Sequence, residues 1–154
     1  MRKLLPLLLV SSLAACAATL HERPAALASA HAMIVARQAG MHMATTLMVK
    51  NIRGAVKAGT DVRDQDAAAD GIAMWAEAIP GLFPAGSSGP DSRARPAIWE
   101  NKGDFDKRAA DLRDAATRLS QIAASGDKTA FAAQVEVVQS RCAACHDAYR
   151  GPAL

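Results

Sequence analysis

Two thiols and an imidazole lie close together near the C-terminus of the sequence. Cys142 and Cys145 are separated by two alanines and His146 follows directly, giving the pattern Cys-x-x-Cys-His. Two thiols at this spacing can each form a thioether with one vinyl group of a single haem, and the next residue can give the iron an axial imidazole. The pattern predicts one covalently attached haem c, with His146 as the proximal iron ligand.

Other uses of two cysteines at this spacing fit the sequence less well. A thioredoxin-like redox pair would accompany a βαβ pattern, and a zinc site would need a second pair of ligands. The remaining cysteine, Cys16, lies near the N-terminus. No nucleophile–base arrangement, paired carboxylates or phosphate loop is recognisable, so we do not expect an enzyme. A haem peroxidase, which would need a polar acid–base group opposite the proximal ligand, and a bundle without a cofactor are the alternatives.

Composition indicates a single helical domain. The chain has 154 residues, of which 51% are hydrophobic but only 4% aromatic, and alanine is abundant. Few residues favour strands, so the chain is predicted to be all-α. The formal net charge is +3; without Arg2 and Lys3, 16 basic residues face 15 acidic ones. This near-neutral balance gives no basis for nucleic-acid binding or for a polybasic membrane patch.

The N-terminal residues predict export. Residues 1–15 are interpreted as a signal peptide, with Arg2 and Lys3 as its charged start and Leu4–Val10 as its apolar segment. That segment is too short to span a bilayer. Export is compatible with covalent haem attachment, and the expected location is the periplasm of a Gram-negative bacterium.

The end of this leader resembles the lipobox of bacterial lipoproteins, at Leu13-Ala14-Ala15-Cys16. The resemblance implies cleavage before Cys16, a diacylglyceryl group on its thiol and anchoring to a membrane by lipid. Ordinary cleavage after Ala17 or Ala18 is the alternative, because the same residues form a small-residue cleavage site. Both alternatives predict export.

Four segments carry apolar residues at helical spacing and predict amphipathic helices, at about 25–57, 61–79, 104–124 and 129–149. Residues 16–24 are expected to form a short tether before them. Gly59 and Gly126 suit the C-terminal caps of the first and third helices, and Pro80 ends the second. Residues 80–95 are rich in glycine, proline and serine and predict one long irregular connection.

Both thiols belong to the inward face of the fourth predicted helix. Apolar side chains recur there at steps of four, three, four and three, at Phe131, Val135, Val138, Cys142 and Cys145. Short links join the first helix to the second and the third to the fourth, and the long link joins the two pairs. Residues 25–154 therefore predict an antiparallel four-helix bundle with haem attached near the end of the fourth helix.

Three segments in this order resemble the cytochrome c-prime family, the class II c-type cytochromes: Arg37-Gln38 with Met41, Arg95-Pro96-Ala97-Ile98-Trp99, and the run from Cys142 to Arg150. The resemblance implies a haem between the helices, with its proximal face toward the last helix and its distal face toward the first. Many members have five-coordinate iron that binds nitric oxide or carbon monoxide. Some relatives ligate the iron with a methionine and transfer electrons.

The resemblance places Met41 at the distal position. Its sulfur can coordinate iron, or its side chain can cover the iron as an apolar plug. Ligation favours electron transfer alone, whereas a plug favours gas binding. Met33, Met43 and Met48 lie nearby. Methionines at helical spacing are more often core residues than ligands, so we expect an open distal site.

The resemblance also gives haem contacts to three polar residues. Arg37 and Gln38 match residues close to the haem edge, where Arg37 would pair with a propionate; a solvated helix face is the alternative. Arg150 follows His146 by one turn and matches a basic residue on the proximal side, or offsets the helix dipole. Expected partners are redox proteins, nitric oxide or carbon monoxide, and a second copy paired through the first two helices.

Overall fold

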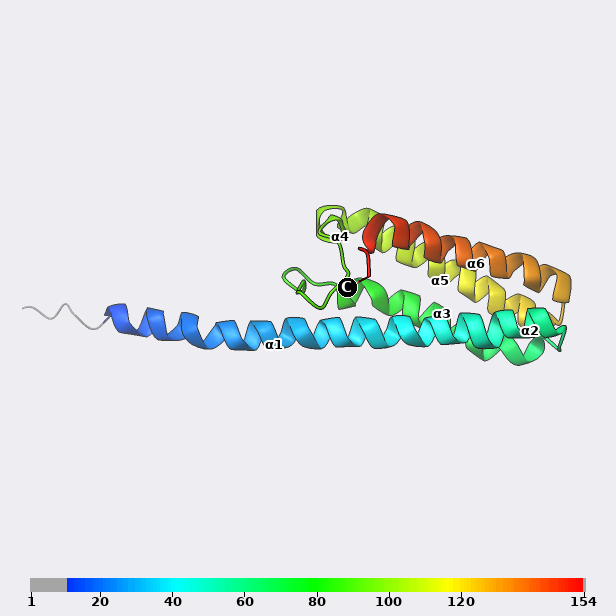
Figure 1. The fold of residues 1–154 in the computed structure, drawn as a ribbon, viewed down its shortest axis with the longest axis horizontal. Coiled ribbons are helices and arrows are strands. Elements are labelled where there is room, and N and C mark those ends of the chain that lie inside the picture. Colours follow the sequence, from blue (N-terminus) through cyan, green and yellow to red (C-terminus); the bar gives the residue numbers. More distant parts are fainter. Residues whose placement is uncertain (1–10, 154) are drawn as a thin grey trace, which may run out of the picture.

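The computed structural model describes residues 11–153, and side chains from residue 29 to 153. Long antiparallel helices lie alongside one another (Figure 1). Among the described residues there is no strand, only an isolated bridge between Ala94 and Arg150. The predicted all-α four-helix bundle is confirmed; its main helices are α1 (Ser11–Thr46), α3 (Asp66–Ala78), α5 (Lys102–Ser125) and α6 (Lys128–Tyr149).

The first helix begins earlier than predicted. We expected it near Ala25 after a tether at residues 16–24, but α1 already starts at Ser11 and includes Pro24. Residues 11–23 are rich in alanine and leucine, strong helix formers, and the loss of one backbone hydrogen bond at Pro24 does not end the helix. In Figure 1 this part of α1 extends beyond the other helices. None of the described helices is long and apolar enough to cross a membrane.

The first helix ends as predicted. A π-helical segment, η1 (Leu47–Ile52), and the short α2 (Arg53–Ala58) continue α1, and Gly59 follows with φ 66°. This left-handed residue ends the helix in the way expected of a C-terminal glycine. A 3₁₀ turn, η2 (Arg63–Gln65), then leads into α3.

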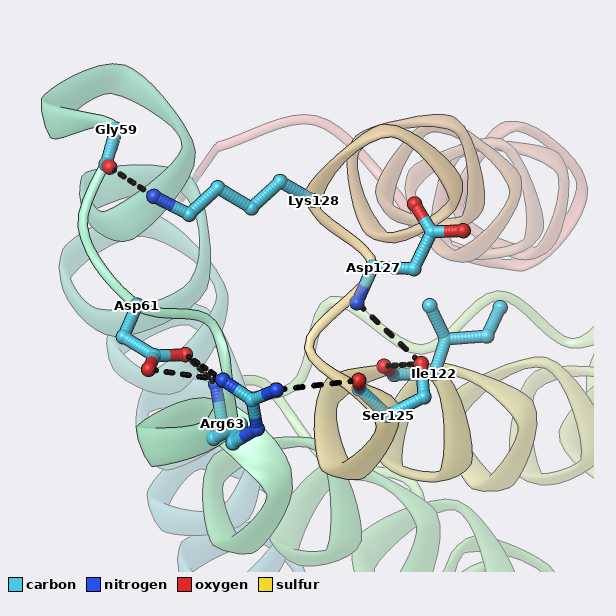
Figure 2. Close-up of polar contacts among 7 residues, drawn as sticks. All are labelled: Gly59, Asp61, Arg63, Ile122, Ser125, Asp127 and Lys128. Atoms are coloured by element: carbon cyan, nitrogen blue, oxygen red, sulfur yellow. Dashed lines mark hydrogen bonds and ion pairs between the residues drawn. The ribbon is translucent and has the colours of Figure 1, made fainter.

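Polar contacts join the two short turns at one end of the bundle (Figure 2). Lys128 Nζ donates a hydrogen bond to the carbonyl of Gly59 at 2.6 Å. Asp127 caps α6 by accepting from the backbone N–H of Ala130 at 2.9 Å, as its position before the helix predicts. The contact from Lys128 therefore ties the start of α6 to the end of α2.

The apolar core has two parts. Cys142 packs against the first part, and Cys145 packs against the second, so the spacing of the thiols bridges the two. The largest fully buried side chains of the first are Ile52, Ile72, Leu119, Phe131 and Val138. The second contains Trp75, Ile79, Phe83, Ile98, Phe105, Ala109 and Tyr149.

A close approach of α1 to α3 lies next to the predicted distal residue. A Cβ atom on Gly40 would collide with the ring of Trp75. Because glycine has no Cβ, the backbone of α1 can rest against the Trp75 ring there. This contact fixes the position of Met41, the next residue, along the axis of the bundle.

One long connection joins the two helix pairs, as predicted. The 3₁₀ turn η3 (Ile79–Leu82) contains Pro80 and follows α3 directly. Residues 83–96, which we call the connecting loop, then lead to α4 (Ala97–Glu100). Trp99 donates from Nε1 to the carbonyl of Pro84 at 2.9 Å, so this half-buried side chain has the polar contact expected of a packed indole.

Candidate functional site

A cavity of about 270 Å³ lies between α1, α6 and the connecting loop. Six of the seven residues predicted to contact the cofactor line it, and Cys142 does not. The sequence therefore identified side chains that the fold brings together from opposite ends of the chain. The six are Arg37, Gln38, Met41, Cys145, His146 and Arg150, and the other lining residues are Ile34, Thr45, Phe83, Ser92, Arg93, Ala94, Ile98, Phe105 and Tyr149.

Met41 is the methionine that faces this cavity from α1. Its side chain is half-buried and lies among the lining residues. Met43 is 43% exposed, and Met48 is buried in the first part of the core. The bundle thus distinguishes Met41 from Met43 and Met48, which the sequence could not do.

The α6 side of the cavity presents Cys145 and His146, both half-buried. Burial lowers the pKa of His146, and the positive charges of Arg150 and Arg93 lower it further. The imidazole is therefore biased toward the neutral form that ligates metals. Burial raises the pKa of both the Cys142 and Cys145 thiols.

Aromatic rings form the apolar wall beneath the motif. Phe105 packs edge-on against Phe83, with ring centroids 4.8 Å apart, and against Tyr149 at 5.3 Å. Ile98 completes this wall and is 2% exposed. Such packing keeps water away from one side of the cavity, so a charge or dipole placed there is weakly screened.

A polar network that sequence reasoning missed supports the motif from α5. The Tyr149 hydroxyl donates to Asp104 Oδ2 at 2.6 Å, and Arg108 Nε donates to the same oxygen at 2.6 Å. These two hydrogen bonds, with that from Tyr149 first, lower the pKa of Asp104. Arg108 also donates to the carbonyl of Ala144 inside the motif at 3.0 Å. In the sequence, the i, i+4 spacing of Asp104 and Arg108 could have indicated their ion pair.

Arg37 is not on a solvated helix face. Its side chain is 4% exposed, and its guanidinium lies over the Phe83 ring, 4.5 Å from the centroid. Nη1 donates to the carbonyl of Leu82 and to Ser87 Oγ, and Nη2 donates to the Ser87 carbonyl and Ser92 Oγ. Burial lowers its pKa. None of these acceptors is a carboxylate, so the buried cation is held by neutral oxygens.

Gln38 and Arg150, the other two polar residues predicted to contact haem, lie at the edge of the cavity. Gln38 is exposed and donates from Nε2 to the carbonyl of Asp91 at 2.8 Å. Arg150 is exposed and lies just past the last residue of α6, in extended backbone. Its N–H donates to the carbonyl of His146 at 2.9 Å. Arg93, which no motif indicated, also lines the cavity because the connecting loop folds back onto it.

Comparison with known proteins agrees with this arrangement. The sequence model of the family described as Cytochrome C' matches residues 32–150. The chain is 36% identical over 88 residues to cytochrome c-554 of Cereibacter sphaeroides, covering 55% of this chain and 65% of that protein, just under two thirds of its length. It is 33% identical over 109 residues to cytochrome c' of Rhodospirillum rubrum, covering 70% of this chain and 74% of that protein.

Solved structures share the fold. The crystal structure of cytochrome c' from Thermochromatium tepidum matches with a TM-score of 0.73 and 32% identity, covering 80% of this chain and 97% of that one. The nitric oxide complex of a mutant of cytochrome c prime from Alcaligenes xylosoxidans matches with a TM-score of 0.72 and 25% identity, over 80% and 97% of the two chains.

The matched segment contains the long connection, the cavity and the whole attachment motif. It begins at Ala32, five residues before Arg37, and ends at Arg150, the last of the predicted site residues. The chain therefore belongs to the cytochrome c' family, whose members bind one covalently attached haem c.

Proposed function

We propose that this chain holds its haem in the cavity between α1 and α6, bonded to Cys142 and Cys145, with His146 as the proximal iron ligand. The function would be one-electron transfer, binding of nitric oxide or carbon monoxide, or both. The observation that carries the proposal is that His146 and Met41 line one cavity from two different helices. When bound, haem supplies an iron that changes oxidation state and can take a diatomic gas.

The residues around the cavity suit haem in chemistry and charge. The half-buried His146 is biased toward its neutral form, and Cys145 lies beside it with Cys142 one turn earlier. Three arginines line the cavity, and its lining includes no aspartate or glutamate. A buried cation such as Arg37 is costly unless an anion compensates it. The two carboxylates of haem would provide that compensation.

The α1 side of the cavity favours electron transfer or gas binding over peroxidase chemistry. Its residues are apolar, amide, hydroxyl or guanidinium side chains, and none is an imidazole or a carboxylate: Ile34, Arg37, Gln38, Met41 and Thr45. A peroxidase uses such a group as an acid–base catalyst opposite the proximal ligand. A mutant of a related protein, with 25% identity to this chain, has been solved as a nitric oxide complex.

Met41 decides between an open and a six-coordinate iron, and we propose that it covers the iron as a plug. The haem-loaded protein is then expected to show a high-spin spectrum in both oxidation states. Met41→Ala should keep that spectrum and bind carbon monoxide faster, since the apolar cover is removed. Absorption spectra and flash photolysis of the ferrous protein provide the measurements.

Met43→Ala is the matched control, because it removes an exposed methionine two residues further along α1. We expect it to leave both the spectrum and the rate unchanged. A low-spin wild-type spectrum that becomes high-spin in Met41→Ala would show instead that Met41 is the sixth ligand and that electron transfer is the sole function.

We further propose that the chain is exported and anchored through Cys16. Residues 1–10 of the predicted signal peptide and the Cys16 side chain lie outside what the structure describes, so this proposal rests on the lipobox-like sequence. Expressed in a Gram-negative host, the wild type should sediment with membranes and gain mass from acyl chains. Cys16→Ser should release it into the periplasmic fraction. A wild type found in the soluble fraction with an unmodified N-terminus would contradict lipidation while leaving export intact.

A further inference from the structure

The connecting loop is fastened to both walls of the cavity. On the α6 side two backbone hydrogen bonds hold the loop, from Arg95 N to the Tyr149 carbonyl at 3.0 Å and from Gly151 N to the Arg93 carbonyl at 2.7 Å. The Arg95 side chain donates from Nη1 to the carbonyls of Asp147 and Ala148. The Arg93 side chain adds a bond from Nε to the Pro152 carbonyl at 2.7 Å. These contacts fix residues 93–95 of the loop against the C-terminal end of the helix that carries His146.

On the α1 side the same loop is held chiefly by one side chain. Arg37 donates to the Ser87 carbonyl at 2.7 Å, to Ser87 Oγ at 2.9 Å, to the Leu82 carbonyl at 3.2 Å and to Ser92 Oγ at 3.3 Å. Hydrogen bonds from a charged donor are stronger than neutral ones, and the two to Ser87 are buried. Gln38 adds a single exposed bond.

The loop therefore bridges the two helices that face one another across the cavity. Along the bundle α1 packs on α3, α3 packs on α5, and α5 packs on α6, so α1 and α6 are linked through the two helices between them. Residues 87–95 run from the Arg37 guanidinium to the end of α6 and connect α1 and α6 beside the cavity. Met41 follows Arg37 by one helical turn, so both project toward the cavity from the same face of α1.

We infer that Arg37 is a positioning residue which, by holding the connecting loop to α1, sets how closely Met41 faces His146 across the haem. This inference rests on the proposed haem site, but it assigns Arg37 a function beyond neutralising a haem carboxylate. When the loop is held, α1 stays close to α6 and Met41 covers the distal side. When the loop is released, α1 loses its direct link to the α6 end of the cavity and keeps its packing on α3, so small molecules gain access to the distal side.

Two variants distinguish the effect of the hydrogen bonds from Arg37 to the loop from the effect of its positive charge. Arg37→Lys keeps a positive charge but loses the planar fork that reaches Leu82, Ser87 and Ser92 together. Ser87→Ala keeps Arg37 and removes one of its hydrogen-bond acceptors. Arg53→Ala is the matched control, because Arg53 is an exposed arginine that follows η1 and does not line the cavity.

The haem-loaded proteins should be compared by thermolysin cleavage within residues 81–92 and by carbon monoxide association to the ferrous form. Arg37→Lys is expected to raise both rates about tenfold, the effect of losing one or two charged hydrogen bonds. Ser87→Ala should raise both rates by a smaller factor, and Arg53→Ala should change neither. Circular dichroism shows whether each variant keeps its helices, and cleavage reports on the loop whether or not the iron binds gas.

An Arg37→Lys protein with wild-type cleavage and wild-type carbon monoxide association would overturn the inference. So would cleavage that rises while gas association stays constant, because the loop would then not control the distal side. A changed reduction potential in Arg37→Ala that Arg37→Lys restores, with both rates unchanged, would show that only the charge matters. Failure of the haem site itself would appear separately, as wild-type protein that carries no attached haem.

Discussion

A variant with both Cys142 and Cys145 changed to alanine is expected to lose all covalently attached haem. Each thiol adds across one vinyl group, so with both removed the haem can be held only by His146 and by noncovalent contacts. Denaturation should then release it completely. Haem staining of a denaturing gel and the intact mass of the mature chain measure the outcome.

The single variants and the third cysteine are the controls for this experiment. Cys142→Ala and Cys145→Ala should each retain haem through the remaining bond. Cys142 packs against the first part of the core and Cys145 lines the cavity, so both thiols face inward along α6. Cys16→Ser should retain haem fully. Attached haem that persists in the double variant would disprove the assignment of the motif.

Phe131→Ala is expected to destabilise the bundle by about 3–5 kcal/mol. Phe131 is completely buried at the start of α6, within the first part of the core. Truncation removes most of a large apolar side chain and leaves a cavity that the rigid neighbouring helices cannot fill. Urea unfolding of the haem-loaded protein, followed by circular dichroism, gives the change in the free energy of unfolding.

Val137→Ala provides a comparison on the same helix, because Val137 is 38% exposed. We expect it to cost less than about 1 kcal/mol. If Phe131→Ala cost no more than Val137→Ala, α6 would not depend on this core for its position.

The fold was predictable where local signals agreed with one another. Glycines at 59 and 126 end helices in left-handed conformations, and Asp127 caps α6 through a hydrogen bond, as their positions indicated. The start of α1 was not predictable, because a proline and a polar run indicated a tether while alanine-rich residues favoured helix. The π-helical segment within the first helix left no pattern that we recognised.

The site was predictable in composition but not in detail. The attachment motif, and the resemblance at Arg37 and Met41, pointed to residues of two helices that line one cavity. The sequence could not show that Arg37 binds the connecting loop, because two of its four acceptors are backbone carbonyl oxygens, which any residue carries. The same reason hid Arg93, whose guanidinium donates to the carbonyls of Gly151 and Pro152.

The attachment motif lies wholly on α6, whereas Met41, the proposed distal residue, belongs to α1. Haem bonded to α6 would stay with the protein even when α1 moves away. Contacts from both α1 and α6 would therefore not be required to retain it. The residues of α1 would then not be needed to prevent haem loss. Substitutions on α1 can alter access to the iron gradually, and each intermediate variant would still be a haem protein.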